Sequence, residues 1–178
     1  MKSTFTKTDT ITENIHAALL ATRKAGKRAK LIVYTLHNAV MLLEQATKCN
    51  DTPNNHNKFL ADADRTAKHA AELAEKACAS LIPFVPAEKL ASSREFFAFS
   101  RKTHAFRIGN TIGAFRKLVY ATMLTNISAE INIPDFGERH TIDTASSFVA
   151  NLESVISIIR IARIDIFNAK NKNTQSTY

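Results

Sequence analysis

Glu13 and His16 are the pair of residues whose types and spacing come closest to a metal centre. A Glu-x-x-His pair lies on one face of a helix, and two such pairs with two further glutamates hold the di-iron centre of some helical bundles. The chain contains no second Glu-x-x-His. We therefore interpret Glu13 as a residue of a helix N-terminus and His16 as incidental, and we expect neither a metal nor a cofactor.

The remaining histidines do not form a recognisable catalytic centre either. Helical ribonucleases of the HEPN class pair an arginine with a histidine further along the same helix. The intervals from Arg65 to His69 and from Arg101 to His104 are both shorter than that class uses. No nucleophile with a base and an orienting acid, and no phosphate-binding glycine loop, follows from the spacing. The sequence therefore predicts that the protein is not an enzyme.

The basic residues predict chemistry of another kind, because they gather in two acid-poor segments. The net charge of the chain is +8, and residues 1–57 and 91–126 carry all of the excess. Lysine and arginine release counterions from nucleic-acid phosphates, which favours binding without base-specific recognition. The residues predicted to contact phosphate are Arg23, Lys24, Lys27, Arg28, Lys30, Arg101, Lys102, Arg107, Arg116 and Lys117, with Arg94 in the same basic segment.

Structural alternatives remain open for both segments. Residues 23–30 are also typical of a solvated junction between helices. Arg107 and Arg116 are also suited to ion pairs with acidic residues of a neighbouring helix. The candidate partners are Asp62, Asp64, Glu72 and Glu75. If the two segments fold onto one face, a polyanion is favoured, and if they scatter, an acidic protein surface is favoured.

The elements that position these residues are expected to be helices. Only four glycines and four prolines occur, and apolar residues recur at helical spacing. Helices are predicted over residues 10–25, 27–48, 58–81, 87–124 and 141–169. Gly26 is interpreted as a hinge or junction, and the sequence leaves open whether the second helix continues the first through it. The fold class is therefore all-α, a four-helix bundle with an additional long C-terminal helix. The phenylalanines of the fourth helix, Phe96, Phe99, Phe106 and Phe115 among them, are predicted to pack in the core rather than to stack on bases.

The predicted organisation has an N-terminal tail over residues 1–9 and a basic bundle over residues 10–125. A loop and C-terminal helix over residues 126–170 pack on the bundle or on a neighbour, and residues 171–178 form a flexible tail. The inner face of the third helix consists mostly of alanines, which allow a short interaxial distance. The fifth helix has a core stripe and a second apolar face. Ile158, Ile161 and Ile164 of that second face are the predicted protein interface.

Gly109 and Gly113 stand four residues apart inside a strong helical pattern. A glycine in a helix interior costs about 1 kcal/mol relative to alanine. We interpret the pair as a site where another helix packs closely, with a helix kink as the alternative. Replacing Gly113 by leucine is then expected to destabilise the fold or an oligomer.

Two local patterns resemble the Avd-like four-helix-bundle proteins, which are accessory factors of diversity-generating retroelements, and their relatives encoded in bacterial 23S rRNA intervening sequences. The fourth helix of that family carries Ile-Gly, two residues, apolar-Gly-small-aromatic and then basic residues, as residues 108–117 do here. The third helix begins with a leucine followed by Ala-Asp, matched by Leu60, Ala63 and Asp64. The resemblance covers residues 10–125. Residues 127–178 have no counterpart in a minimal member, and alanines stand where the family's third helix has leucines.

This resemblance implies a ring-like homo-oligomer, a pentamer, that binds a reverse transcriptase and its structured RNA and catalyses nothing itself. Together with the charge pattern it predicts a non-enzymatic accessory protein that binds nucleic acid and prefers RNA. The alternative is a phage- or mobile-element-encoded adaptor or inhibitor of a protein, or a structural assembly subunit. Residues 1–10 lack an apolar signal region and no apolar run is long enough to span a membrane. A cytoplasmic protein with free Cys49 and Cys78 is expected, and no membrane partner.

Overall fold

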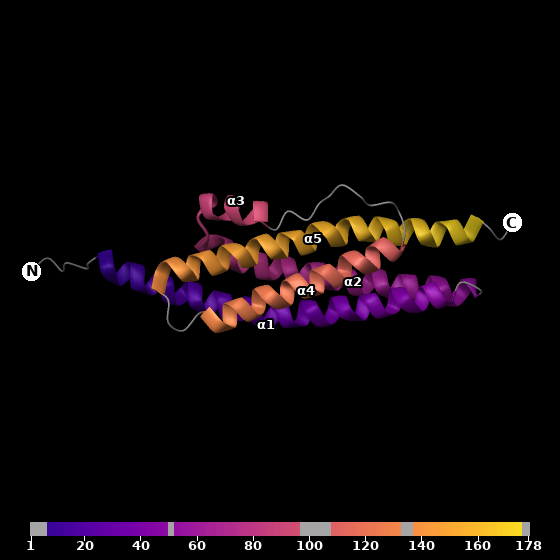
Figure 1. Ribbon diagram of the computed structural model, residues 1–178, viewed down its shortest axis with the longest axis horizontal. Helices are drawn as coiled ribbons and strands as arrows, with labels where there is room; N and C mark the ends of the chain where they lie inside the picture. Colours follow the sequence, from indigo (N-terminus) through magenta and orange to yellow (C-terminus); the bar gives the residue numbers. More distant parts are fainter. Residues whose placement is uncertain (1–6, 50–51, 97–107, 133–136, 176–178) are drawn as a thin grey trace, which may run out of the picture.

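The computed structural model describes the backbone of residues 7–49, 52–96, 108–132 and 137–175, and the side chains of residues 14–49, 52–94, 108–127 and 140–172. All of the regular elements in these ranges are helices, which confirms the predicted all-α class. The long helices lie along one axis and give the molecule an elongated shape (Figure 1).

The first helix, α1 (Lys7–Lys48), is a single element of 42 residues, about 63 Å long. The predicted hinge or junction at Gly26 is therefore wrong, and the open question of whether one helix continues through Gly26 is answered, because it does. Gly26 is buried, and a Cβ atom added there would lie 2.9 Å from Oδ1 of Asn126. The glycine thus lets another helix approach α1 and does not break it.

The second helix, α2 (Pro53–Leu81), begins five residues earlier than the predicted Lys58. Pro53 is favourable in a first helical turn because its missing N–H would have no intrahelical partner. The short connection makes α2 run back along α1 (Figure 1). Nδ1 of the buried His56 lies 2.6 Å from the carbonyl oxygen of Ala46 and links the two helices at this end.

The predicted single helix over residues 87–124 is wrong as well. After the short 3-10 helix η1 (Ile82–Phe84), α3 (Ala87–Phe96) packs on α5 (Gly137–Gln175), whereas α4 (Ile108–Asn132) packs on α1 and α5. Within the described residues the segment therefore forms two separate helices, both of which pack on α5. The residues between them, including Phe97, Phe99 and Phe106, lie outside the described part, as does the side chain of Phe96.

The remaining long helices enclose the core together. α1 lies against α2 and α4, and α5 lies against the same two helices from the other side (Figure 1). Hydroxyl groups of α4 reach α5 at two levels, with Thr122 donating to Oδ1 of Asn151 and Thr111 to Oδ2 of Asp165, each at 3.2 Å. The C-terminal helix is thus an integral part of the helical bundle.

The core confirms the apolar stripes that helical spacing predicts. The alanines of α2, at positions 63, 67, 70 and 74, are completely buried, and so is Phe115 of α4. The stripe of α5 is buried at Phe148, Leu152, Val155, Ile159, Ala162 and Ile166, with Ile156 packed against it. The small residues of α2 face Ala25, Ala29 and Ile32 of α1 in the same cluster, which suits a close approach of the two helices.

One helix among the described residues is long and apolar enough to cross a membrane by composition alone. This segment, His140–Lys172 of α5, is also the stretch that lines the core, and 56% of its most apolar window is buried inside the protein. Because a central core helix has the same composition, the observation is weak evidence for a membrane span.

Candidate nucleic-acid interface

Ion pairs join neighbouring helices in the described part of the chain and account for several of the arginines. Arg94 and Lys89 of α3 pair with Glu153 and Asp143 of α5, at 2.6 and 3.0 Å. Arg160 and Arg163 of α5 pair with Glu75 and Asp64 of α2, at 3.4 and 2.9 Å. Arg116 of α4 pairs with Glu44 of α1. These cations hold helices together.

Hydrogen bonding to a carboxylate strengthens two of these pairs. Arg94 donates from Nε and Nη2 to the two carboxylate oxygens of Glu153, and Arg163 donates in the same way to Asp64. The bond from Glu153 raises the pKa of Arg94, and the bond from Asp64 raises the pKa of Arg163. Paired planar groups of this kind are geometrically specific.

Only some of the predicted phosphate contacts in the second basic segment, residues 101–117, remain candidates. Arg116 forms an ion pair, as the alternative allowed, but its partner is Glu44 and none of the predicted acids of residues 62–75. Lys117 is exposed on α4. Arg101, Lys102 and Arg107 lie outside the described residues.

The first predicted basic segment has a different character. Arg23, Lys24 and Lys27 are exposed on α1 and Arg28 is half-buried. Among the described residues, no carboxylate lies within ion-pair distance of these four cations. Lys30 is exposed on the same helix. The segment is continuous helix, so the alternative of a helix junction is wrong.

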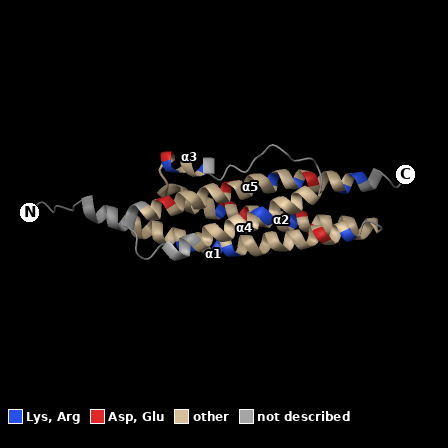
Figure 2. Ribbon diagram, viewed as in Figure 1, with Lys and Arg blue, Asp and Glu red and all other residues tan. Residues whose placement is uncertain are grey.

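The described members of the two segments do not form one patch. α1 and α4 run antiparallel, with Asn126 against Gly26 and Arg116 paired with Glu44. Lys117 is nine residues from Asn126, which places it about 14 Å along α4 from the level of Gly26. Blue residues are correspondingly distributed along the bundle in Figure 2. The outer face of α1 over residues 23–30 is therefore the main cationic site of the described chain.

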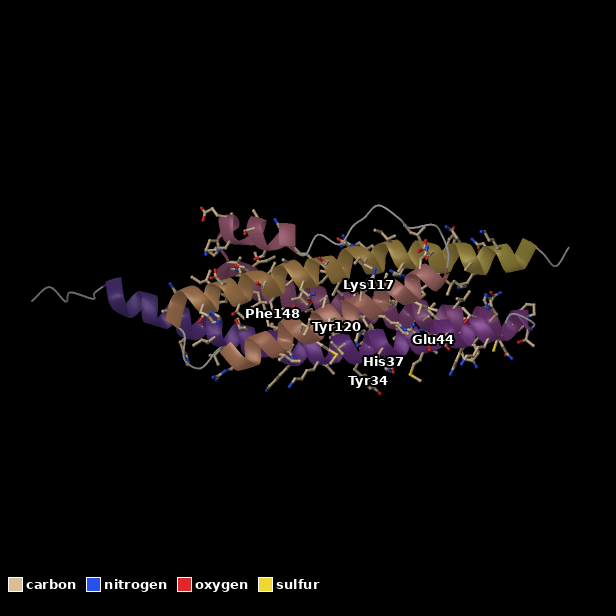
Figure 3. The ribbon with its side chains drawn as sticks, viewed as in Figure 1. Tyr34, His37, Glu44, Lys117, Tyr120 and Phe148 are labelled. Atoms are coloured by element: carbon tan, nitrogen blue, oxygen red, sulfur yellow. The ribbon has the colours of Figure 1, made fainter. Side chains whose placement is uncertain are left out.

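Two exposed tyrosines lie at the same level of the bundle on the neighbouring helices α1 and α4 and were not among the predicted site residues. Tyr34 of α1 is 67% exposed and Tyr120 of α4 is 65% exposed. Two contacts between α1 and α4 mark one stretch of the bundle, Asn126 against Gly26 and Arg116 with Glu44. Tyr120 lies between these contacts on α4, and Tyr34 and His37 lie between them on α1 (Figure 3). Lys27, Lys30 and Tyr34 are spaced three and four residues apart, so the sequence could have indicated that they share one face of the helix.

The glycine pair of α4 does not pack against another helix of this chain. A Cβ atom added at Gly109 or Gly113 would meet no described atom within 4 Å. Gly109 is exposed and Gly113 is half-buried. Among the described residues the pair makes no close helix contact, so its predicted packing role stays a prediction that concerns an oligomer, and Gly26 is the glycine at a close contact.

Apolar side chains are exposed on α4 rather than where the interface was predicted. Ile158 and Ile161 of α5 are half-buried, with Ile158 packed against the core, and Ile164 is exposed. Met123, Leu124 and Ile127 of α4 are exposed together within about one turn of helix. α4 thus exposes an apolar surface next to Tyr120, and α1 exposes Leu20, Leu31 and Met41 as well.

The described residues contain no group of three or more potential metal ligands from His, Cys, Asp and Glu. His16 is exposed, and the side chain of Glu13 lies outside the described residues. Both cysteines are free. Burial, with a further contribution from the charge of Glu153, raises the pKa of Cys78 to about 11, so its thiol is protonated at neutral pH. A protonated buried thiol is a poor nucleophile.

Comparisons with known proteins give no family for the chain. No protein-family model matches it, no curated protein is similar to it, and no solved structure matches it.

Proposed function

We propose that this protein is a non-enzymatic accessory protein that binds nucleic acid, with a preference for RNA, through the outer face of α1. The observation that carries the proposal is the difference between its cations. Arg94, Arg116 and Arg163 are held by carboxylates of other helices, whereas Arg23, Lys24 and Lys27 have no such partner among the described residues. Unpaired surface cations are available to replace counterions on a phosphate backbone.

The supporting architecture is a four-helix bundle of α1, α2, α4 and α5, with α3 as a cover on α5. This arrangement is part of the proposal. A four-helix bundle is also the fold class of the Avd-like proteins. The four helices are not the four predicted from the sequence, because α1 covers the first two predicted helices. On this resemblance the protein partner is a reverse transcriptase and the assembly is a homo-oligomer, and the site of action is the cytoplasm.

The test is RNA binding by the double variant Lys24→Ala/Lys27→Ala. We expect its affinity for RNA to fall about 10-fold at moderate salt, because two phosphate contacts are lost. The slope of log affinity against log salt should decrease by about 1.4 for a single strand. Fluorescence polarisation of a labelled RNA, titrated at several salt concentrations, measures both quantities.

The matched control is Lys68→Ala/Lys76→Ala on α2, which lowers the net charge by the same amount. Both lysines are exposed, and they lie on a different helix from the proposed site. Equal losses in the two double variants would show that RNA responds only to net charge, and would contradict an α1 site. Wild-type protein that binds no RNA would refute the proposal.

A second function is favoured by a separate observation. Met123, Leu124 and Ile127 expose an apolar surface on α4 that a protein partner would cover. A protein adaptor or inhibitor, or an assembly subunit, would use this surface, and the cations of α1 would then face an acidic protein. The described cations are scattered along the bundle, and this distribution favours an adaptor or inhibitor that contacts an acidic protein.

A further inference from the structure

We propose that the side of the bundle shared by α1 and α4 binds an unpaired segment of RNA, with phosphates on the cations of α1 and bases stacked on Tyr34 and Tyr120. This inference rests on the proposed function, because it names the kind of nucleic acid that the same surface takes. We call this side the α1–α4 face and define it by Arg23, Lys27, Tyr34 and Tyr120.

The first argument is the order of cations and aromatic residue along α1. Arg23, Lys27 and Tyr34 follow one another at intervals of four and seven residues, which keeps them on one side of the helix. Lys27 and Tyr34 are about 10 Å apart along the axis. The cations have no described carboxylate partner and the ring is 67% exposed, so both are available to a ligand.

The second argument is that α4 places another exposed aromatic ring beside α1. Tyr120 is exposed on α4, and α4 is a direct neighbour of α1. His37 of α1 is exposed in the same stretch (Figure 3). A strand that crosses from α1 to α4 therefore meets a second exposed aromatic ring, Tyr120, beyond the cations and the ring of α1.

The third argument concerns which nucleic acid such a surface fits. Positively charged side chains that follow a backbone, combined with aromatic rings for the bases, are typical of single-strand binding. The bases of a duplex already stack on one another, and the deep major groove of an RNA duplex is closed to side chains. Tyrosines on the outside of a straight helix therefore find exposed base faces only where the RNA is unpaired.

The experiment compares a labelled oligouridylate with an RNA duplex of the same length. We expect Tyr34→Ala to weaken binding of the single strand about 5-fold or more and to leave binding of the duplex unchanged. Tyr34→Phe keeps the ring and should bind as the wild type does. Phe167→Ala is the matched control, because Phe167 is an equally exposed aromatic residue on α5, near the arginines that pair with α2.

Intrinsic fluorescence gives a second readout in the same titration. The chain has no tryptophan and three tyrosines, so the ultraviolet emission comes from tyrosine alone. Stacking of bases on Tyr34 and Tyr120 should quench this emission with the single strand. The quenching should be smaller in Tyr34→Phe and smaller still in Tyr34→Phe/Tyr120→Phe, since each change removes an emitting ring from the face.

The possible failures are distinguishable. If Tyr34→Ala binds the oligouridylate as tightly as the wild type while Lys24→Ala/Lys27→Ala binds it weakly, the stacking inference is overturned and the proposed function stands. Equal loss on single strand and duplex would also overturn it, because stacking would not be the cause. If the wild type binds neither RNA, the proposed function fails and the inference fails with it.

Discussion

At the scale of single residues, the structure distinguishes basic residues that form interhelical ion pairs from basic residues that are exposed to solvent, although both kinds lie in the same basic segments of the sequence. Arg116 and Lys117 are adjacent in the chain, yet the first forms an interhelical ion pair and the second is exposed to solvent. Exposed ion pairs contribute little to stability, typically less than about 1 kcal/mol each. Their main consequence here is that they remove Arg94, Arg116 and Arg163 from the set available to a ligand.

The buried thiol of Cys78 gives a prediction at the same scale. Burial raises its pKa from 9.0 to about 11, so the folded protein retains a proton that the unfolded chain loses above pH 9. The stability that this group contributes is fully present below pH 9 and is lost as the pH rises towards 11. Thermal unfolding across this pH range should therefore show a steeper decrease in melting temperature for the wild type than for Cys78→Ala.

Alkylation of the native protein provides the control for this prediction. Cys49 is half-buried and should react with iodoacetamide at mildly alkaline pH, whereas Cys78 should not react until the protein unfolds. Parallel pH profiles for wild type and Cys78→Ala would contradict the assignment.

At the scale of the elements, the contact between α1 and α4 depends on Gly26. The two helices meet where Oδ1 of the buried Asn126 would be 2.9 Å from a Cβ atom at that position. Any larger residue at position 26 therefore requires the side chain of Asn126 to move. Gly113, by contrast, has no described atom near the position of an added Cβ. The effect of a substitution there on stability therefore follows the helix propensity of the new residue.

Alanine substitutions at these two glycines should therefore have opposite effects. Gly113→Ala should raise the free energy of unfolding by about 0.5–1 kcal/mol, because alanine loses less conformational entropy in a helix. Gly26→Ala should lower it by about 1–3 kcal/mol, since a buried side chain must move. Chemical denaturation of both variants measures the two changes.

Asn126→Ala provides the internal check on this pair. It removes the atom that the new methyl group would meet, so Gly26→Ala should no longer be destabilising in the Asn126→Ala background. If Gly26→Ala stabilises the wild type as much as Gly113→Ala does, the proposed close contact between α1 and α4 is wrong.

At the scale of the whole molecule, the exposed apolar surface of α4 bears on assembly. Tyr120 lies among the residues of this surface, so self-association through them and RNA binding at Tyr120 exclude one another. We predict that the wild type freed of nucleic acid has a mass in solution that is a multiple of 19.7 kDa, and that Leu124→Asp/Ile127→Asp has the mass of one chain. Substitutions at exposed positions usually change stability by less than about 0.5 kcal/mol, so the variant should still fold. Light scattering after removal of nucleic acid at high salt measures the mass.

Ile164→Asp is the matched control, because Ile164 is exposed on α5 and belongs to the interface that the sequence predicted. If this change alone dissociates the assembly, the interface lies on α5. A wild-type mass of 19.7 kDa would show that the protein does not self-associate, and the α4 surface would then serve a different protein.

The sequence by itself determined the helical class and the buried stripes. Apolar spacing identified the alanine face of α2 and the face that contains Phe148 and Leu152 on α5, because a helix must bury its apolar side whatever its neighbours are. It also located the cations of α1. Only the tertiary structure decided which glycine sits at a helix contact, which arginines are paired and which tyrosines remain exposed. Those properties depend on the side chains that neighbouring helices bring from positions far away in the chain, such as Asn126 opposite Gly26 and Glu44 opposite Arg116, and local spacing carries no information about them.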